Sequence, residues 1–283
     1  MIVVSAKNSS ALAARIAKEL GCGIAGTEVS RFPDGELYVR ILSALADSDV
    51  VLVGDTGSDA GIMETMLLGD AALEGRPEKI TTVIPYFGYA RQHRRYKDGE
   101  AISSRALCKL LDAFSDSIVT VELHNEQTVG YSSKPFMNIK IVEPIASHFA
   151  ESGIGIVISP DDGGAVRASE TARILGIGYA CIEKKRIDAA TVEMKLPDVR
   201  INGEGVLLVD DMISTGGTIL KAAELLRKAG AGKIYVGAVH GLFANGSGEK
   251  ISKIVDELAV TDTIESRFST IHIARNIADV LKG

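Results

Sequence analysis

Several features that would define a specialised class of protein are scarce in this sequence. Its three cysteines, Cys22, Cys108 and Cys181, are odd in number, far apart and never in a C-x-x-C spacing. This pattern argues against a disulfide framework and a zinc site, and it is typical of reduced thiols in a cytoplasmic protein. No apolar run reaches membrane-spanning length, and the apolar start of the chain is too short for a signal peptide. The sequence therefore predicts a soluble, cytoplasmic protein without a membrane partner.

Positively charged residues are also fewer than negatively charged ones. The chain has 31 Lys and Arg residues against 37 Asp and Glu residues, a formal net charge of −6. This balance argues against a nucleic-acid partner, whereas a small anionic ligand needs only a local arrangement of amides and cations. With 283 residues, 46% of them hydrophobic, the chain is long enough for two ordinary globular domains.

Short runs of Val, Ile and Leu alternate with amphipathic segments along the whole chain. The candidate strands are 2–5, 37–41, 50–53, 80–85, 118–123, 155–159, 178–182, 206–209, 233–239 and 270–273. Between them, apolar residues recur at intervals of three and four, as in 10–20, 103–114 and 218–229. Continuous apolar strands separated by helices predict parallel sheets that are covered on both faces, which is α/β architecture.

Two segments share the same internal order. "VVLVGDTGSDAGIMETMLLGDAALEGRPEKITTV" (50–83) and "VLLVDDMISTGGTILKAAELLRKAGAGKIYVG" (206–237) each contain a strand, a loop with Asp and Gly, a helix and a second strand. Any two βαβ units share such a pattern, but the chain length and the placement of the copies favour a duplicated domain. We expect the boundary near residues 140–150, with domains at 1–143 and 144–283.

The stretch "VLLVDDMISTGGTIL" combines an acid pair, which repels anions, with a segment that is suited to bind one. The strand 206–209 should bring Asp210 and Asp211 to the carboxyl end of a sheet, where α/β folds bind their ligands. Residues 214–218 then open a helix, whose free amides favour an anion, and the two glycines allow the backbone to approach a phosphate. Carboxylates cannot bind the phosphate, but they accept hydrogen bonds from a sugar diol. The loop therefore predicts a sugar-phosphate site, with an ordinary Asp cap and Gly-rich turn as the alternative.

The first half of the chain has two further polar motifs. "RFPDGELYVR" (31–40) places an aromatic ring and two acids at a turn before a strand. "PYFGYARQHRRYKDGEAISS" (85–104) gathers Arg91, Arg94 and Arg95 beside Gln92. Such an arginine cluster after a strand suits a polyphosphate, although a solvated basic loop is the alternative.

Three other positions are ambiguous by themselves. His124 follows the strand 118–123, where a lone histidine is more often a structural hydrogen-bonding residue than a ligand. Asp161 follows the strand 155–159, where an acid also serves as a helix cap. The run Lys184–Arg186 after the strand 178–182 is, by its charge alone, an exposed hairpin tip.

Taken together, these motifs resemble those of the ribose-phosphate diphosphokinases, whose sugar-phosphate loop is shared with type I phosphoribosyltransferases. The resemblance covers nearly the whole chain. It implies an α/β fold of two tandem phosphoribosyltransferase-like (Rossmann-like) domains with central, mostly parallel sheets flanked by helices. It also implies a reaction between ATP and ribose 5-phosphate that gives 5-phospho-α-D-ribose 1-diphosphate and AMP, a Mg²⁺ cofactor and a homo-oligomer.

The resemblance assigns a role to each motif. It implies that ribose 5-phosphate is bound by Arg186, Asp210, Asp211, Ser214, Thr215, Gly216, Gly217 and Thr218. It implies that ATP is bound by Phe32, which stacks on adenine, and by Asp34, Gly35, Glu36, Arg91 and Gln92. His124 and Asp161 would be Mg²⁺ ligands, and Lys184 and Arg186 would be the catalytic cations. The chain departs from many family members at Ser214, where they have an acid, and at Glu122, where they have aspartate.

Two other interpretations share parts of this pattern. A phosphoribosyltransferase that consumes phosphoribosyl diphosphate would have the same sugar-phosphate loop but a base pocket in place of an ATP site. The duplicated pattern and the arginine cluster argue against it. A catalytically silent regulatory member of the family would be expected to lose the acid pair or the Lys-x-Arg motif, and both are present here.

Overall fold

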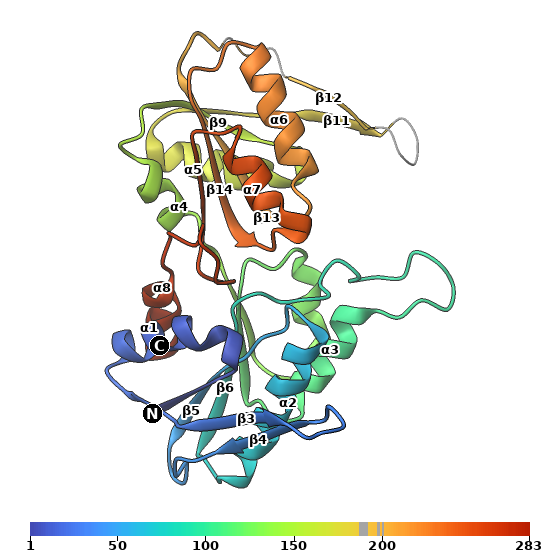
Figure 1. Cartoon of the computed structure of the whole chain (residues 1–283), viewed down its shortest axis with the longest axis vertical. Coiled ribbons are helices and arrows are strands. Elements are labelled where there is room, and N and C mark those ends of the chain that lie inside the picture. Colours follow the sequence, from blue (N-terminus) through green and yellow to red (C-terminus); the bar gives the residue numbers. More distant parts are fainter. Residues whose placement is uncertain (187–191, 197–198, 200) are drawn as a thin grey trace. The chain divides into compact units, whose positions relative to one another are not determined.

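The computed structural model describes residues 1–283 except 187–191, 197–198 and 200 (Figure 1). The chain forms two compact units. The first consists of Met1–Lys140 together with Ala274–Gly283, and the second consists of Ile141–Ile273. Among the described residues, no helix combines the length and the hydropathy needed to cross a lipid bilayer.

The first unit is built on a six-stranded sheet in which every neighbouring pair is parallel. In spatial order its strands are β2 (Gly23–Ile24), β1 (Ile2–Ser5), β5 (Asp49–Val53), β6 (Lys79–Ile84), β7 (Ser117–Val121) and β8 (Phe136–Ile139). Its helices are η1 (Lys7–Ser9), α1 (Ser10–Leu20), α2 (Asp59–Glu74), α3 (Ser103–Asp112), η2 (Glu126–Tyr131) and α8 (Ala274–Lys282). An antiparallel hairpin of β3 (Thr27–Arg31) and β4 (Leu37–Ile41) is inserted between β2 and β5.

The second unit is built on a five-stranded parallel sheet. In spatial order its strands are β10 (Gly178–Cys181), β9 (Ile154–Ser159), β13 (Gly205–Ile213), β14 (Ile234–Gly241) and β15 (Glu257–Val260). Its helices are α4 (Glu143–Phe149), η3 (Asp162–Gly164), α5 (Ala165–Leu175), α6 (Gly217–Lys228), η4 (Ala244–Gly246) and α7 (Ser247–Ser252). Here too a hairpin, β11 (Glu183–Arg186) with β12 (Val192–Lys195), is inserted after the second strand.

The two units follow the same plan, which supports the duplication inferred from the sequence. In each sheet the first strand lies between the second strand and the later ones, which number four in the first unit and three in the second, and an antiparallel hairpin precedes these later strands. The two similar sequence segments occupy equivalent places, β5–α2–β6 and β13–α6–β14. A side-chain contact is also repeated. Asp116 accepts a 2.8 Å hydrogen bond from the backbone N–H of Ile80, and Asp256 accepts a 2.8 Å hydrogen bond from that of Ile234. The predicted α/β fold class is confirmed.

Both sheets are hydrophobic on the two faces, as the unbroken apolar strands require. In the first unit Leu52, Ile80 and Ile118 are at most 1% exposed and pack with Leu68 of α2 and Leu111 of α3. Burying such a side chain stabilises the fold by about 1.5–3 kcal/mol. In the second unit every residue of β14 is buried. These cores hold the carboxyl ends of the strands, and therefore the loops that follow them, in fixed positions.

The helix that ends the chain packs in the first unit, although it follows the last strand of the second. The apolar face of α8, with Ile277 and Ala278 fully buried, packs on α1. Its counterpart α4 follows β8 of the first unit and packs on α5 in the second. The second unit therefore ends at Ile273, and not at residue 283 as the expected domains had it.

Three expected strands differ from the observed ones in their pairing or by more than two residues at an end. Residues 270–273 form only an isolated bridge, Thr261 to Ile271, because the Asp262 carboxylate takes the N–H of Ile273 at 3.0 Å in place of a ladder bond. The segment 37–41 is a strand, but it pairs within a hairpin and not in the parallel sheet. The strand expected at 206–209 continues to Ile213.

Candidate active site

The acid pair lies at the carboxyl end of the central strand of the second unit. Because β13 continues to Ile213, Asp210 and Asp211 belong to the strand, and Asp210 lies opposite Ala238 of β14. Both acids are half-buried. The ladder therefore fixes their backbone, and only their side chains are left to adapt to a ligand.

Gly216 forms the turn from this strand into α6. Its φ of +75° lies in the left-handed region, which favours glycine. A Cβ there would also come within 2.9 Å of the Ser247 Cβ and 3.0 Å of the Ile251 Cδ1. Ser247 donates a 2.8 Å hydrogen bond from Oγ to the Ser214 carbonyl, so α7 supports the turn from behind.

The loop presents donors that the fold does not use. In the part of the chain that the structure describes, the backbone N–H groups of Thr215, Gly216 and Gly217 form no hydrogen bond, and neither do the hydroxyls of Thr215 and Thr218. These groups surround the amino end of α6, where the helix dipole favours an anion. These donors could receive an anion, and the phosphate site stays a prediction.

The equivalent loop of the first unit, after β5, is closed by its own acid. Asp55 accepts 2.7 Å and 2.8 Å hydrogen bonds from the N–H of Gly57 and the side-chain amide of Asn8. Ser58 caps α2 by accepting the N–H of Gly61 at 3.0 Å. A Cβ on Gly61 would lie only 2.3 Å from an Asp55 carboxylate oxygen, so the carboxylate already fills the space beside the helix end.

Three carboxylates influence one another at the end of the second sheet. Burial raises the pKa of Asp210 well above its usual value, and the negative charges of Asp211 and then Asp161 raise it further. Asp161 follows β9, the strand beside β13, and accepts the N–H of Gly163 at 3.1 Å. A cation or a set of hydroxyl donors would relieve this repulsion.

The metal prediction is chemically reasonable for these residues. Mg²⁺ prefers oxygen ligands, keeps several waters and is commonly bound by one or two carboxylates together with substrate phosphates. Asp161 supplies a half-buried carboxylate within the acidic cluster, and His124 is exposed after β7 in the first unit. No group of three or more His, Cys, Asp or Glu side chains among the described residues could enclose an ion. The residues therefore suit an ion that completes its coordination with water and phosphate oxygens.

The loop after β7 that contains His124 is held by charged and polar side chains. Glu122 is 2% exposed, has a φ of +43° and lies 3.9 Å from the ammonium group of Lys140. The same ammonium group lies 2.6 Å from Glu126. Asn138 accepts the N–H of Leu123 at 3.0 Å and donates to Glu126 at 2.8 Å. These contacts, which the sequence did not predict, fix the backbone on both sides of His124.

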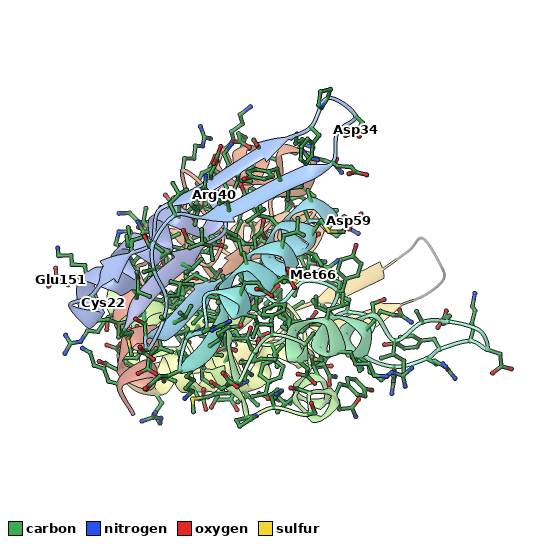
Figure 2. The ribbon with its side chains drawn as sticks, turned by 90° about the horizontal axis from the view of Figure 1, so that it is seen from below. Cys22, Asp34, Arg40, Asp59, Met66 and Glu151 are labelled. Carbon is green, nitrogen blue, oxygen red and sulfur yellow. The ribbon has the colours of Figure 1, made fainter. Side chains whose placement is uncertain are left out.

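The turn of the β3–β4 hairpin presents the predicted nucleotide residues to solvent. Phe32 is 51% exposed, and its ring meets the Tyr38 ring edge to face at a centroid distance of 5.8 Å. The turn is closed by 2.9 Å bonds from Phe32 N–H to the Glu36 carbonyl and from Gly35 N–H to the Phe32 carbonyl. Figure 2 shows Asp34 at the far end of this hairpin, away from the sheet. An exposed ring on a rigid turn is suited to stacking against a base.

The arginine-rich segment after β6 is organised around Glu100, which the sequence did not identify. One carboxylate oxygen accepts the N–H groups of Tyr96 and Lys97 at 2.8 Å and 3.0 Å and the side-chain amide of Gln92 at 3.2 Å. The backbone hydrogen bonds from Tyr96 and Lys97 hold the pKa of Glu100 below its usual value. The guanidinium of Arg94 stacks 5.0 Å from the centre of the Tyr96 ring. Arg91 and Gln92 thus lie at the base of an ordered loop.

The predicted catalytic cations lie on the β11–β12 hairpin. Lys184 and Arg186 are on β11, opposite Met194 and Val192 of β12. The hairpin follows β10 and extends outward from the second unit in Figure 1. Residues 187–191, which join the two strands, lie outside the described residues.

The site residues therefore divide between the two units. The acid pair, the phosphate-type loop, Asp161 and the Lys-x-Arg hairpin belong to the second unit. The Phe32 hairpin, the Arg91 segment and His124 belong to the first. Within each unit, the residues lie at the carboxyl ends of parallel strands, on the loops that follow them, or on the inserted hairpin.

Comparison with known proteins gives one consistent family. Residues 1–114 match the N-terminal domain of ribose phosphate pyrophosphokinase, and residues 137–270 match the phosphoribosyl transferase domain. The ribose-phosphate pyrophosphokinase of Thermoplasma volcanium is 45% identical, with 100% of this chain and 99% of that protein covered. The ribose-phosphate pyrophosphokinase of Pyrococcus furiosus is 44% identical, with 91% and 93% covered.

A solved structure agrees with these sequence matches. The crystal structure of phosphoribosylpyrophosphate synthetase from Mycobacterium smegmatis aligns with a TM-score of 0.85 and 28% identity, covering 99% of this chain and 97% of that one. Fold, domain order and sequence thus coincide over the full length. The chain belongs to the ribose-phosphate pyrophosphokinase family.

Proposed function

We propose that the chain transfers the diphosphate of ATP to the 1-hydroxyl of ribose 5-phosphate, giving 5-phospho-α-D-ribose 1-diphosphate and AMP. The observation that carries the proposal is the segment 210–218, in which an acid pair at the end of β13 adjoins amides and hydroxyls that have no partner among the described residues. A diol and a phosphate ester on one small molecule are complementary to these two groups. Membership of a family whose members are named ribose-phosphate pyrophosphokinases supports the same substrate.

In the proposed reaction the anomeric oxygen attacks the β-phosphorus of ATP. The bond from the β-phosphorus to the α–β bridging oxygen breaks, AMP leaves with that oxygen, and the anomeric hydroxyl loses its proton to solvent. Asp210 and Asp211 hold the 2′ and 3′ hydroxyls, while the backbone and hydroxyls of Ser214–Thr218 hold the 5-phosphate. Binding the sugar at both ends fixes the anomeric hydroxyl for attack, which is a large part of catalysis in phosphoryl transfer.

The nucleotide is proposed to bind to the first unit. The exposed ring of Phe32 stacks on adenine, and Asp34, Gly35 and Glu36 of the same turn contact the nucleoside. Arg91 and Gln92 contact the phosphates from the ordered base of their loop. Glu100 supports this role, because it holds the backbone of the segment and the Gln92 amide in place.

Charge neutralisation is assigned to the hairpin cations and to Mg²⁺. Lys184 and Arg186 stabilise the charge that develops on the bridging and equatorial oxygens, and Arg186 also contacts the sugar phosphate. His124 and Asp161 would hold Mg²⁺, which supplies Lewis-acid polarisation of the phosphates when it is bound. Lys185 has no role in this scheme.

The direct test measures AMP formation from ATP and Mg²⁺ with and without ribose 5-phosphate. The proposal expects AMP only when the sugar phosphate is present. Lys184→Ala should lower kcat by at least about 100-fold with little change in ATP binding, because a transition-state cation is lost. The matched control is Lys185→Ala, which should keep near-wild-type turnover. Equal activity in Lys184→Ala would remove the catalytic assignment.

A phosphoribosyltransferase is the second candidate, since the loop 210–218 would serve it equally well. That activity would appear as diphosphate release from phosphoribosyl diphosphate in the presence of a nucleobase, without any need for ATP. The exposed Phe32 hairpin and the ordered arginine segment favour the diphosphokinase, because a phosphoribosyltransferase has no use for a second nucleotide site. A catalytically silent regulatory member of the family would form no AMP in the direct test.

Two features of the working protein are also part of the proposal. We infer a homo-oligomer, because Phe32 lies on the exposed turn of the β3–β4 hairpin, where a second copy of the chain can complete the nucleotide site. We infer a cytoplasmic enzyme, because its three free cysteines suit a reducing compartment and both substrates are intracellular metabolites. Light scattering of the purified chain tests the first inference.

A further inference from the structure

His93 connects two segments of the first unit that the proposed function uses separately. It directly follows Arg91 and Gln92, and its backbone carbonyl accepts a 2.7 Å hydrogen bond from the hydroxyl of Tyr131. Its ring Nε2 lies 3.2 Å from the side-chain nitrogen of Asn125, the neighbour of His124. The segment that follows His124 is therefore bonded to one residue, His93, near both of its ends.

The surrounding hydrogen bonds determine the state of this ring. Asn125 Oδ1 accepts the N–H of Gln127 at 2.9 Å and caps η2, so its Nδ2 is the atom that faces His93. An amide nitrogen only donates, and therefore His93 Nε2 is the acceptor and Nδ1 carries the proton. Nδ1 is buried and has no partner among the described residues.

An unpartnered buried donor costs stability, so the histidine is not explained by stability alone. A residue with only one polar atom would make the Asn125 bond without leaving a buried N–H unsatisfied. What histidine adds is a stiff side chain, whose ring spans the distance to Asn125 while its own backbone is held by Tyr131. The His93 side chain is therefore suited to hold the Arg91–Gln92 segment and the segment after His124 at a fixed distance from each other.

We propose that His93 is a positioning residue that acts through Asn125 to hold His124 for a divalent cation. The inference rests on the proposed function, because it takes His124 as a ligand. It goes further by tying the cation site to the Arg91–Gln92 segment in one rigid assembly within the first unit. Residues that orient a metal ligand from outside typically change metal affinity about 10- to 100-fold when they are replaced.

The experiment measures the dissociation constant of Mn²⁺, an oxygen-preferring substitute for Mg²⁺, by electron paramagnetic resonance on the full-length chain without nucleotide. His93→Leu removes the acceptor and should weaken Mn²⁺ binding about 10-fold. His93→Gln, whose carbonyl can accept the Asn125 bond, should stay within about threefold of the wild type. The melting temperature of His93→Leu should stay close to that of the wild type, because the lost bond is offset by removal of the unsatisfied donor.

A double-mutant cycle separates positioning from general loosening. If His93 acts through Asn125, then Asn125→Ala should weaken Mn²⁺ binding about as much as His93→Leu, and the double variant should be no weaker than either. His148→Leu is the matched control, because His148 is a histidine of the second unit whose ring also has a single polar partner among the described residues, Glu257 at 2.7 Å, and lies far from the first unit's motifs in sequence. It should bind Mn²⁺ like the wild type.

The outcomes of these experiments distinguish the positioning role of His93 from the proposed function on which it rests. Unchanged Mn²⁺ affinity in His93→Leu, or losses that multiply in the double variant, would overturn the positioning role even if the wild type forms AMP. A wild type that binds no Mn²⁺ would overturn it as well. A wild type that forms no AMP from ATP and ribose 5-phosphate would instead overturn the proposed function, and the inference with it.

Discussion

Asp210 illustrates how a single residue is held in an unfavourable state by its surroundings. Its half-buried carboxyl lies at the end of β13 beside Asp211 and near Asp161, and desolvation and the two negative charges all raise its pKa. The unfolded chain ionises this carboxyl near its usual pKa of about 3.9. The folded state therefore binds the proton more tightly, and the residue makes folding less favourable as the pH rises from that value through the raised one.

Replacing Asp210 by asparagine should stabilise the protein and remove its affinity for the sugar phosphate. At pH 7–8 the melting temperature should rise by about 2–4 °C for each kcal/mol recovered, and the gain should shrink as the pH is lowered toward about 4. Calorimetry at several pH values measures the first effect, and titration with ribose 5-phosphate measures the second. A less stable variant at neutral pH would contradict the described electrostatics.

At the scale of elements, the loop that is organised around Glu100 depends on the ionisation of one carboxylate. Because the pKa of Glu100 is lowered by hydrogen bonds to Tyr96 and Lys97, its ordering effect is complete above the unfolded pKa of about 4.3. It is lost as the pH falls through the lower, folded value. Gln92 depends on the same carboxylate, so the loop and the proposed phosphate contacts are ordered together.

Glu100→Ala should raise the KM for ATP severalfold and leave the KM for ribose 5-phosphate unchanged. The loop would lose its central acceptor, whereas the sugar-phosphate loop belongs to the other unit. Asp98→Ala is the matched control, since Asp98 is an exposed acid in the same segment. Steady-state kinetics with each substrate varied decide the matter, and equal rises in both KM values would contradict the assignment.

Helix α8 offers a second test at the scale of elements. Ile277 is fully buried where α8 packs on α1, so Ile277→Ala should cost about 2–5 kcal/mol. Hydrogen exchange should show that α1 of the first unit loses protection. Helix α5 of the second unit should keep its protection, although α8 follows the second unit in sequence. The exposed Asp279→Ala serves as control. Loss confined to α5 would contradict the packing described.

Sequence periodicity predicted those elements whose pattern is local. The helix at 10–20 was predicted with the observed bounds from its apolar spacing. The hairpin partner of 37–41 and the destination of α8 were missed, since pairing and packing depend on residues far away in sequence. The Asp–Gly loop after β13 was recognisable from residue types alone, but Glu100, His93 and Asn125 act through tertiary contacts that no local motif encodes.

At the scale of the whole molecule, one plan is used twice with different loops. The loop after β13 leaves its amides and hydroxyls open, whereas the loop after β5 satisfies its own with Asp55 and Ser58. The shared strand order shows that this difference lies in the loops and not in the sheets. The duplication therefore yields one open loop of this kind per chain, to which we assign the sugar phosphate, whereas we assign the nucleotide to the first unit.

Calorimetric titration with ribose 5-phosphate tests this account most directly. We predict one site per chain in the wild type and no measurable binding in the double variant Asp210→Asn/Asp211→Asn, because the diol loses both charged acceptors. The folded state of the variant is checked by circular dichroism. Two sites per chain, or undiminished affinity in the folded double variant, would contradict the assignment of the sugar phosphate to the loop after β13.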